Sequence, residues 1–139
     1  MYDNGMVAPV MALVLWTLFI WAWMYATRIP AMQAGKVRPQ EGAAAGALKA
    51  HLPAKVNQIA DNYNHLMEQP TIFYATAFAA QLAGADDAAN IGFAWAYVAL
   101  RIVHSLVQCT ANVVVVRFAV FALGSLALAV LAVRTVLAL

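Results

Sequence analysis

The chain has 139 residues, of which 65% are hydrophobic and 10% are charged. Soluble domains carry roughly 25% charged residues, so this composition excludes an ordinary water-soluble fold and indicates an integral membrane protein. The net charge of +2 is small, and we expect membrane lipids rather than nucleic acid as partners. The single cysteine, Cys109, excludes an intrachain disulfide bond.

The first predicted helix is an apolar segment over residues 5–27. It belongs to a run of 24 residues without a charged side chain, which would form a helix about 36 Å long. That length exceeds the roughly 30 Å of a bilayer core, so the segment can cross a membrane. No Lys or Arg precedes this run, and it is longer than the apolar part of a signal peptide, which argues against cleavage.

The other three predicted helices all contain polar side chains. The second has only 17 uncharged residues, at 69–85, and reaches membrane length only when the polar approach to it is included. The third carries Arg101 and His104 near its middle, and the fourth has Arg117 near its start and Arg134 near its end. We predict one domain over residues 1–139 with four helices, at about 5–27, 55–84, 90–109 and 113–137.

The connections between these helices predict the topology. Residues 28–54 are rich in proline and glycine, which is typical of a loop. The links at 84–88 and 110–112 are tight, and short links join antiparallel neighbours. The sequence therefore predicts an all-α, up-down four-helix bundle in the membrane.

The basic residues predict how this bundle is oriented. Five of them lie between the first two predicted membrane segments, whereas the second link carries only Asp86 and Asp87. The positive-inside rule then places the first loop in the cytoplasm and both termini outside it, as expected for a protein of the bacterial inner membrane. Arg134, near the outer end, is expected to extend to the membrane surface. The five basic residues are Arg28, Lys36, Arg38, Lys49 and Lys55.

Two stripes of polar side chains lie within the second and third predicted helices. In each stripe the residues follow one another at helical spacing, so they share one face of their helix. The stripes are Asp61, Asn64, His65 and Glu68 in the second helix, and Arg101, His104, Ser105 and Gln108 in the third.

Arg101 lies near the middle of its helix, where burial of a charge costs roughly 2.5–3.5 kcal/mol on insertion scales. We predict that Glu68 is its partner, within one subunit or across an interface. Such a pair can serve only to fix helix packing, or it can belong to a ligand site, and both alternatives stay open.

A group of polar residues is predicted at the cytoplasmic end, and it comprises Arg28, Asn64, His65, Gln108 and Arg117, with Arg38 of the loop as a further candidate. Cations, amides and an imidazole would suit a small anionic molecule that contains amides, because arginine binds carboxylates bidentately. The alternative for both arginines is simple anchoring at the membrane surface, and for His104 it is a hydrogen bond in the packed interior. The histidines have no ligand-like spacing, so we expect no metal site.

Two motifs of the chain resemble the MAPEG family, the membrane-associated proteins in eicosanoid and glutathione metabolism. The segment from Arg101 to Asn112, with His104 three residues after the arginine, is similar to the family's third helix, and Arg117 resembles the arginine that opens its fourth. The segment 64–70 resembles the Asn…Glu…Pro element of the second helix. With the four-helix layout, the resemblance to a divergent bacterial member covers nearly the whole chain.

The resemblance implies a homotrimer with a glutathione site between subunits near the cytoplasmic face. It implies a glutathione-dependent transferase or peroxidase that acts on lipophilic substrates arriving from the lipid. Arg117 would stabilise the glutathione thiolate, since a nearby cation lowers the pKa of a thiol. Arg101 and Glu68 match the family's buried polar core. The positions that match its glutathione contacts are Arg28, His104 and Arg117, together with Asn64.

Several positions differ from the pattern of glutathione-using members. The alternative function is therefore a non-catalytic membrane protein, which binds a lipid or packs as a subunit of a larger membrane complex. The differences are Tyr63 in place of an arginine, the four-residue spacing of Asn64 and Glu68, Gln108 in place of a tyrosine, and Phe118 and Phe121 near the positions of hydroxyl donors.

Overall fold

The structure is a computed structural model, and it describes residues 5–139. The first four residues of the predicted domain lie outside the described part. All regular structure in residues 5–139 is helical, as predicted. The α-helices are α1 (Val7–Ala34), α2 (Ala54–Leu66), α3 (Pro70–Leu82), α4 (Ala88–Cys109) and α5 (Val114–Leu137), with short 3-10 helices η1 (Pro39–Gly42) and η2 (Ala47–His51) between α1 and α2.

Three of the described helices, α1, α4 and α5, are long and apolar enough to cross a membrane. They have 28, 22 and 24 residues respectively, and at a rise of 1.5 Å per residue even the shortest extends about 33 Å. This confirms the prediction of an integral membrane protein. The first helix continues to Ala34 rather than ending near residue 27, and it stops where Lys36 adopts a left-handed φ of 54°.

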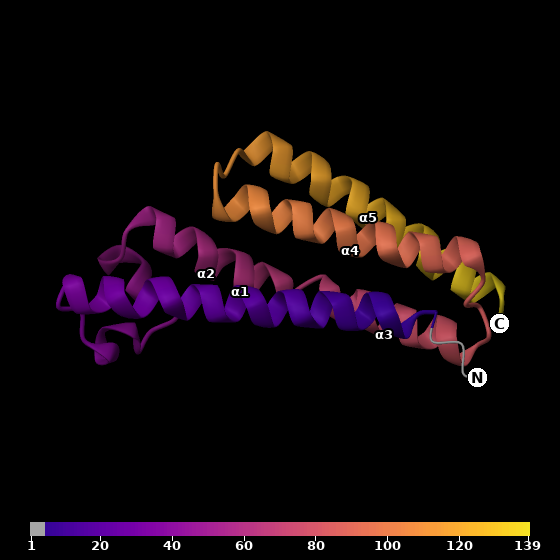
Figure 1. Cartoon of the computed structure of the whole chain (residues 1–139), viewed down its shortest axis with the longest axis horizontal. Helices are drawn as coiled ribbons and strands as arrows, with labels where there is room; N and C mark the ends of the chain where they lie inside the picture. Colours follow the sequence, from indigo (N-terminus) through magenta and orange to yellow (C-terminus); the bar gives the residue numbers. More distant parts are fainter. Residues whose placement is uncertain (1–4) are drawn as a thin grey trace.

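The second predicted helix, over 55–84, is interrupted in the structure. Its two parts, α2 and α3, have 13 residues each and lie end to end (Figure 1). Pro70 explains the break, because it has no N–H group and its ring would clash with the carbonyl of Leu66, four residues earlier. The polar approach and the apolar segment are therefore separate helices, and neither is long enough by itself to be a candidate membrane span.

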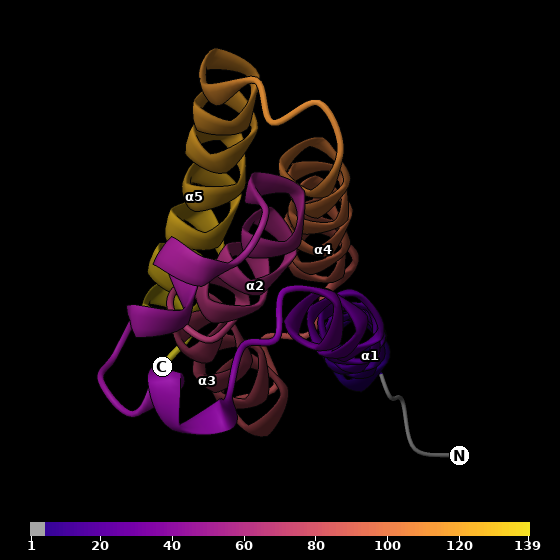
Figure 2. The same cartoon turned by 90° about the vertical axis from the view of Figure 1, so that its left-hand side faces the viewer.

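The helices run up and down, as the short links predict. Both described chain ends and the turn between α3 and α4 lie at one end of the bundle, and the long loop and the turn between α4 and α5 lie at the other (Figure 1). Viewed along the bundle, α4 lies between α1 and α5, and it contacts both (Figure 2). The arrangement brings the polar faces of α2 and α4 toward each other near the looped end.

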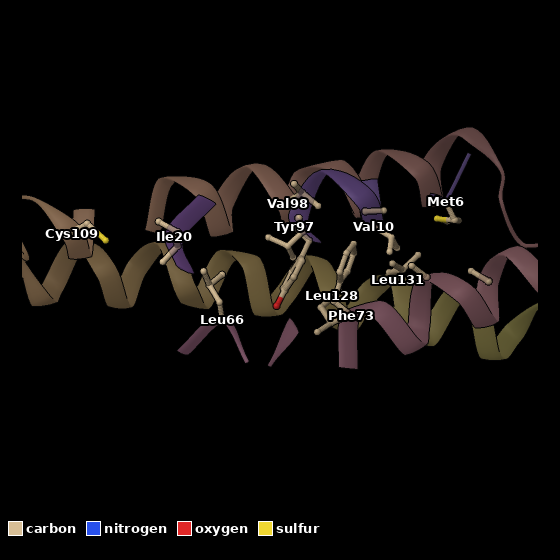
Figure 3. Packing of buried hydrophobic residues seen from close by; sticks show 14 of the residues in the cluster. Met6, Val10, Ile20, Leu66, Phe73, Tyr97, Val98, Cys109, Leu128 and Leu131 are labelled. Carbon is tan, nitrogen blue, oxygen red and sulfur yellow. The ribbon is translucent and has the colours of Figure 1, made fainter. Parts of the chain in front are cut away.

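The core is apolar along most of its length. Phe73 of α3 stacks on Tyr97 of α4 with ring centroids 4.5 Å apart, next to Leu128 and Leu131 of α5 (Figure 3). Towards the other end, Cys109, Ile20 and Leu66 continue the same cluster (Figure 3).

At the interruption between α2 and α3, both the nitrogen and the oxygen of one side-chain amide, that of Gln69, form hydrogen bonds. The amide nitrogen Nε2 of Gln69 donates to Ser125 Oγ at 2.9 Å, and the hydroxyl of Tyr97 donates to Gln69 Oε1 at 3.1 Å. Gln69 thus links the break to both α4 and α5. These two bonds satisfy both the oxygen and the nitrogen of the Gln69 amide, which would be costly to bury without partners.

A polar clamp closes the end opposite the long loop. Asp87 caps α4 by accepting hydrogen bonds from the backbone N–H groups of Ala89 and Asn90, at 2.9 and 3.2 Å. Arg134 of α5, predicted to extend to the membrane surface, forms an ion pair there with Asp87 at 3.2 Å and donates to Asn90 Oδ1 at 2.6 Å. The hydrogen bond from Asn90, with that from Ala89 and the charge of Arg134, lowers the pKa of the Asp87 carboxyl below its ordinary value.

Candidate functional site

A cleft of about 190 Å³ opens where α2, α4 and the first turns of α5 meet. It lies at the end of the bundle that holds the long loop. Aromatic and aliphatic side chains form part of its wall, and two histidines and an arginine form the rest. The lining residues are His65, His104, Val114, Arg117, Phe118 and Phe121.

Two histidines stack on each other in this cleft. The rings of His65 on α2 and His104 on α4 have centroids 4.8 Å apart and planes inclined by 15°. Phe121 of α5 lies 5.4 Å from the first ring and 6.3 Å from the second. The sequence placed both histidines on polar stripes, but their stacking depends on how α2 and α4 are rotated against each other.

Arg101 is buried next to this histidine pair, with only 1% of its surface exposed. Its Nη2 lies 2.8 Å from Nδ1 of His65. Arginine can only donate, so Nδ1 accepts, and the ring proton of His65 is assigned to Nε2. The Nε and Nη1 atoms of Arg101 have no hydrogen-bond partner among the described residues.

The predicted pair between Glu68 and Arg101 does not form within the described chain. The two ion pairs found there are Lys49–Asp61 and Arg134–Asp87, and Glu68 is exposed. The reason is the break before Pro70. Since α2 ends at Leu66, Glu68 no longer follows the helical spacing that placed it on the stripe. A pair across a subunit interface stays a prediction.

Arg117 is held at the mouth of the cleft by the turn before α5. Its Nη1 donates to Oδ1 of Asn112, a residue with a left-handed φ of 53°. The Nε of Arg117 has no partner in the described part of the chain. Arg117 thus lines the cleft, whereas Arg101 is buried behind His65, and neither arginine forms an ion pair with a carboxylate of residues 5–139.

Arg28 and Asn64 lie in a different cavity, of about 230 Å³, between α1, the loop and α2. The ion pair of Lys49 and Asp61, at 2.9 Å, forms part of its wall. Consecutive residues of a helix point about 100° apart, so Asn64 and His65 face different cavities. Within one chain, the predicted group at the cytoplasmic end is thus divided in two.

Gln108, the remaining predicted site residue, lines neither of these two cavities. It is buried, and its Oε1 has no partner among the described residues. Phe118 and Phe121, which the sequence suggested only as replacements for hydroxyl donors, are wall residues of the cleft. Within residues 5–139, no three His, Cys, Asp or Glu side chains come together as a metal site would require.

Comparison with known proteins supports the interpretation of the two motifs. The model of the MAPEG family matches residues 6–137, nearly the whole chain, which confirms the resemblance drawn from the segments around Arg101 and Asn64. Comparisons with curated proteins and with solved structures gave no match. The match covers all five α-helices, and the chain belongs to the MAPEG family.

Proposed function

We propose that the chain binds glutathione and acts as a membrane-bound transferase or peroxidase on lipophilic substrates. The observation that carries the proposal is that His65, His104 and Arg117 line one cleft, with Arg101 buried behind it against His65. Neither arginine forms an ion pair with a carboxylate in the described chain. In the low-dielectric interior, a charge that is not compensated attracts an anion strongly. An anionic ligand is the natural complement of this cleft.

Glutathione matches the chemistry of these residues. It has two carboxylates and two peptide groups, which correspond to the cations and amides predicted at this end. We assign His104 and Arg28 to the carboxylates and Asn64 to a peptide group, with Arg117 near the sulfur. Neither cavity alone reaches the roughly 300 Å³ typical of the smallest ligand sites, so both are needed.

The two cavities can act together across a subunit interface. We propose a homotrimer in which the cavity of Arg28 and Asn64 from one subunit lies against the cleft of His104 and Arg117 from the next. A head-to-tail contact of this kind closes into a ring when the rotation between subunits is right. Exposed Glu68 would then lie at the interface.

Bound glutathione would supply a thiol that becomes a nucleophile when it ionises. The protein would promote this ionisation electrostatically, because a guanidinium close to the sulfur favours the thiolate over the thiol. Arg117 suits this role, since its bond to Asn112 fixes the guanidinium at the cleft mouth. The apolar wall of Phe118 and Phe121 would accept the lipophilic substrate from the membrane.

Calorimetry and ultraviolet absorbance on the detergent-solubilised protein test this proposal. We expect wild type to bind glutathione and to generate a thiolate absorbance band. Arg117→Ala should lose the band, and Arg117→Lys should retain part of it because the charge is kept. S-methylglutathione is the matched control ligand, since it can bind but cannot ionise. Absence of binding at millimolar glutathione would exclude the enzyme hypothesis.

The second candidate is a non-catalytic protein that binds a lipid or packs in a larger membrane complex. It is favoured by the apolar lining of the cleft, where Phe118 is 70% exposed. In that case, bound lipid would co-purify with the protein and glutathione would not displace it. Cross-linking in native membranes would separate a trimer of identical chains from a mixed complex.

We also propose that the protein lies in a bacterial inner membrane with its long loop in the cytoplasm. The support is the concentration of basic residues in that loop. Single cysteines introduced at Gln40 and Ala138, in a Cys109→Ala background, would test this. A membrane-impermeant reagent added to intact cells should label the second position and leave the first unmodified.

A further inference from the structure

A groove of about 600 Å³ lies where α1 meets the long loop, separate from the cleft and the cavity described above. This end of α1 extends beside η1 at the looped end of the bundle (Figure 1). The lining is mainly apolar, with two cations. Its apolar lining includes Ile29, Met32, Val37 and Pro39, and its two cations are Lys36 and Arg38.

The length of α1 between its start and the groove is close to the thickness of a bilayer core. Ile29 follows Val7 by 22 residues of continuous helix (29 minus 7), a rise of about 33 Å. The hydrocarbon core of a bilayer is about 30 Å thick. The ion pair of Asp87 and Arg134 lies at the opposite end of the bundle, between the start of α4 and the end of α5. If α1 enters the hydrocarbon core at Val7, this length places the groove just beyond the opposite edge of the core, at the level of the lipid phosphates.

The backbone at this helix end holds the two cations in place. The N–H of Val37 donates to the carbonyl of Met32 at 2.8 Å, and the N–H of Lys36 donates to that of Gln33 at 3.2 Å. With the left-handed φ of Lys36, these two bonds form a Schellman motif. The chain turns sharply, and Lys36 and Arg38 follow one another on either side of Val37.

Neither cation is neutralised by an ion pair within the described chain. The ion pairs of residues 5–139 involve other residues, and both Lys36 and Arg38 are exposed. Glu41 is close in the chain, but its carboxylate caps the start of η1 by accepting a hydrogen bond from the backbone N–H of Arg38 at 3.0 Å. Two free cations thus stand beside an apolar hollow at phosphate depth.

We propose that this groove binds one anionic phospholipid of the adjacent leaflet. Its phosphate contacts Lys36 and Arg38, and the upper part of an acyl chain lies against Ile29, Met32 and Val37. Basic pockets beside membrane helices are a recognised way of binding anionic headgroups. A free phosphate ion would use the cations but leave the apolar lining bare, and a zwitterionic lipid would lack the net charge that complements them.

Native mass spectrometry of the full chain in detergent tests this proposal. The protein is titrated with phosphatidylglycerol and with phosphatidylcholine that carry the same acyl chains. We expect wild type to retain phosphatidylglycerol preferentially. The double variant Lys36→Gln/Arg38→Gln should lose about fivefold in affinity for each cation, or about 25-fold together.

The matched control is Lys49→Gln/Lys55→Gln, which removes two charges at the same end of the molecule but not from the groove. It should retain phosphatidylglycerol like wild type. Ile29→Ser, which leaves both cations in place, should weaken retention of either lipid. Circular dichroism and elution volume establish that each variant is folded before it is titrated.

Three results would overturn the proposal. Equal retention of the two lipids by wild type would show that charge does not select the occupant. Equal loss in the two double variants would show that general positive charge, not the groove, is responsible. Displacement of the lipid by millimolar inorganic phosphate would show that the site recognises phosphate alone. None of these results bears on glutathione binding.

Discussion

The hydroxyl of Tyr97 offers a direct test of how the break between α2 and α3 is stabilised. Tyr97 is fully buried on α4, and its hydroxyl donates to Gln69 Oε1 at the break between α2 and α3. The substitution Tyr97→Phe removes this hydroxyl and keeps the ring, which stacks on Phe73. The loss therefore isolates one hydrogen bond without creating a large cavity.

The expected cost follows from the surroundings of Gln69. A hydrogen bond between membrane helices contributes about 0.6 kcal/mol on average and about 1.7 kcal/mol at most. Loss of Tyr97 also leaves Gln69 Oε1 without this donor in the interior, and an unsatisfied buried group costs about 1–3 kcal/mol. We expect Tyr97→Phe to lower the free energy of unfolding by about 1–2 kcal/mol.

Unfolding in mixed detergent, followed by circular dichroism, measures this change. Tyr25→Phe is the matched control, because Tyr25 is 41% exposed on α1. A double-mutant cycle with Ser125→Ala tests the rest of the network, since Ser125 accepts from the amide of Gln69 at 2.9 Å. We expect the two losses to be coupled, because both substitutions act on one side chain.

Two outcomes would refute this reasoning. The first is a Tyr97→Phe variant that is no less stable than Tyr25→Phe, because the hydroxyl would then contribute nothing to the fold. The second is strict additivity of Tyr97→Phe and Ser125→Ala. In that case Gln69 would not connect α4 to α5, and the break would depend on packing alone.

Three further predictions concern the packing of α4 and α5. Gly124→Ala should raise the free energy of unfolding by about 0.5–1 kcal/mol. The new methyl group would lie 3.7 Å from the nearest side-chain atom, which is an ordinary van der Waals distance. A loss of stability on thermal unfolding would show instead that the packing of α4 against α5 requires the glycine. Leu131→Ala, at a fully buried position, should cost about 2–5 kcal/mol, whereas exposed Leu126→Ala should cost little in the same assay. The pKa of Asp87 is lowered in the folded state, so the stability that its carboxylate contributes is complete above about pH 4 and is lost as the pH falls further. Acid unfolding of Asp87→Asn should therefore be less steep than that of wild type, and identical acid transitions would contradict the role given to the clamp with Arg134.

The membrane class and most helix boundaries could be predicted from the sequence. The third and fourth predicted helices, 90–109 and 113–137, agree within two residues with α4 and α5. This is possible because transfer of a helix into lipid depends mainly on the sum of its own side chains. The motifs around Asn64 and Arg101 also identified the family, which the match over residues 6–137 confirmed.

The candidate site was predicted only in part. The sequence placed His65, His104 and Arg101 on facing stripes, and the structure joins the three through ring stacking and a hydrogen bond. The sequence did not predict that Arg28 and Asn64 would line a separate cavity. Glu68 failed as an intrachain partner because helical spacing applies only while the helix continues, and α2 ends at Leu66.

Local sequence thus determined which segments are long and apolar enough to cross a membrane, where the charges lie and which family the chain belongs to. Tertiary structure decided which side chains meet, because contact depends on the rotation of each helix about its axis and on where the helix is broken. The stack of His65 on His104, the bonds of Gln69 to α4 and α5, and the ion pair of Arg134 with Asp87 all join residues far apart in the chain. No hydropathy pattern specifies those pairings, since each depends on how separate helices pack together.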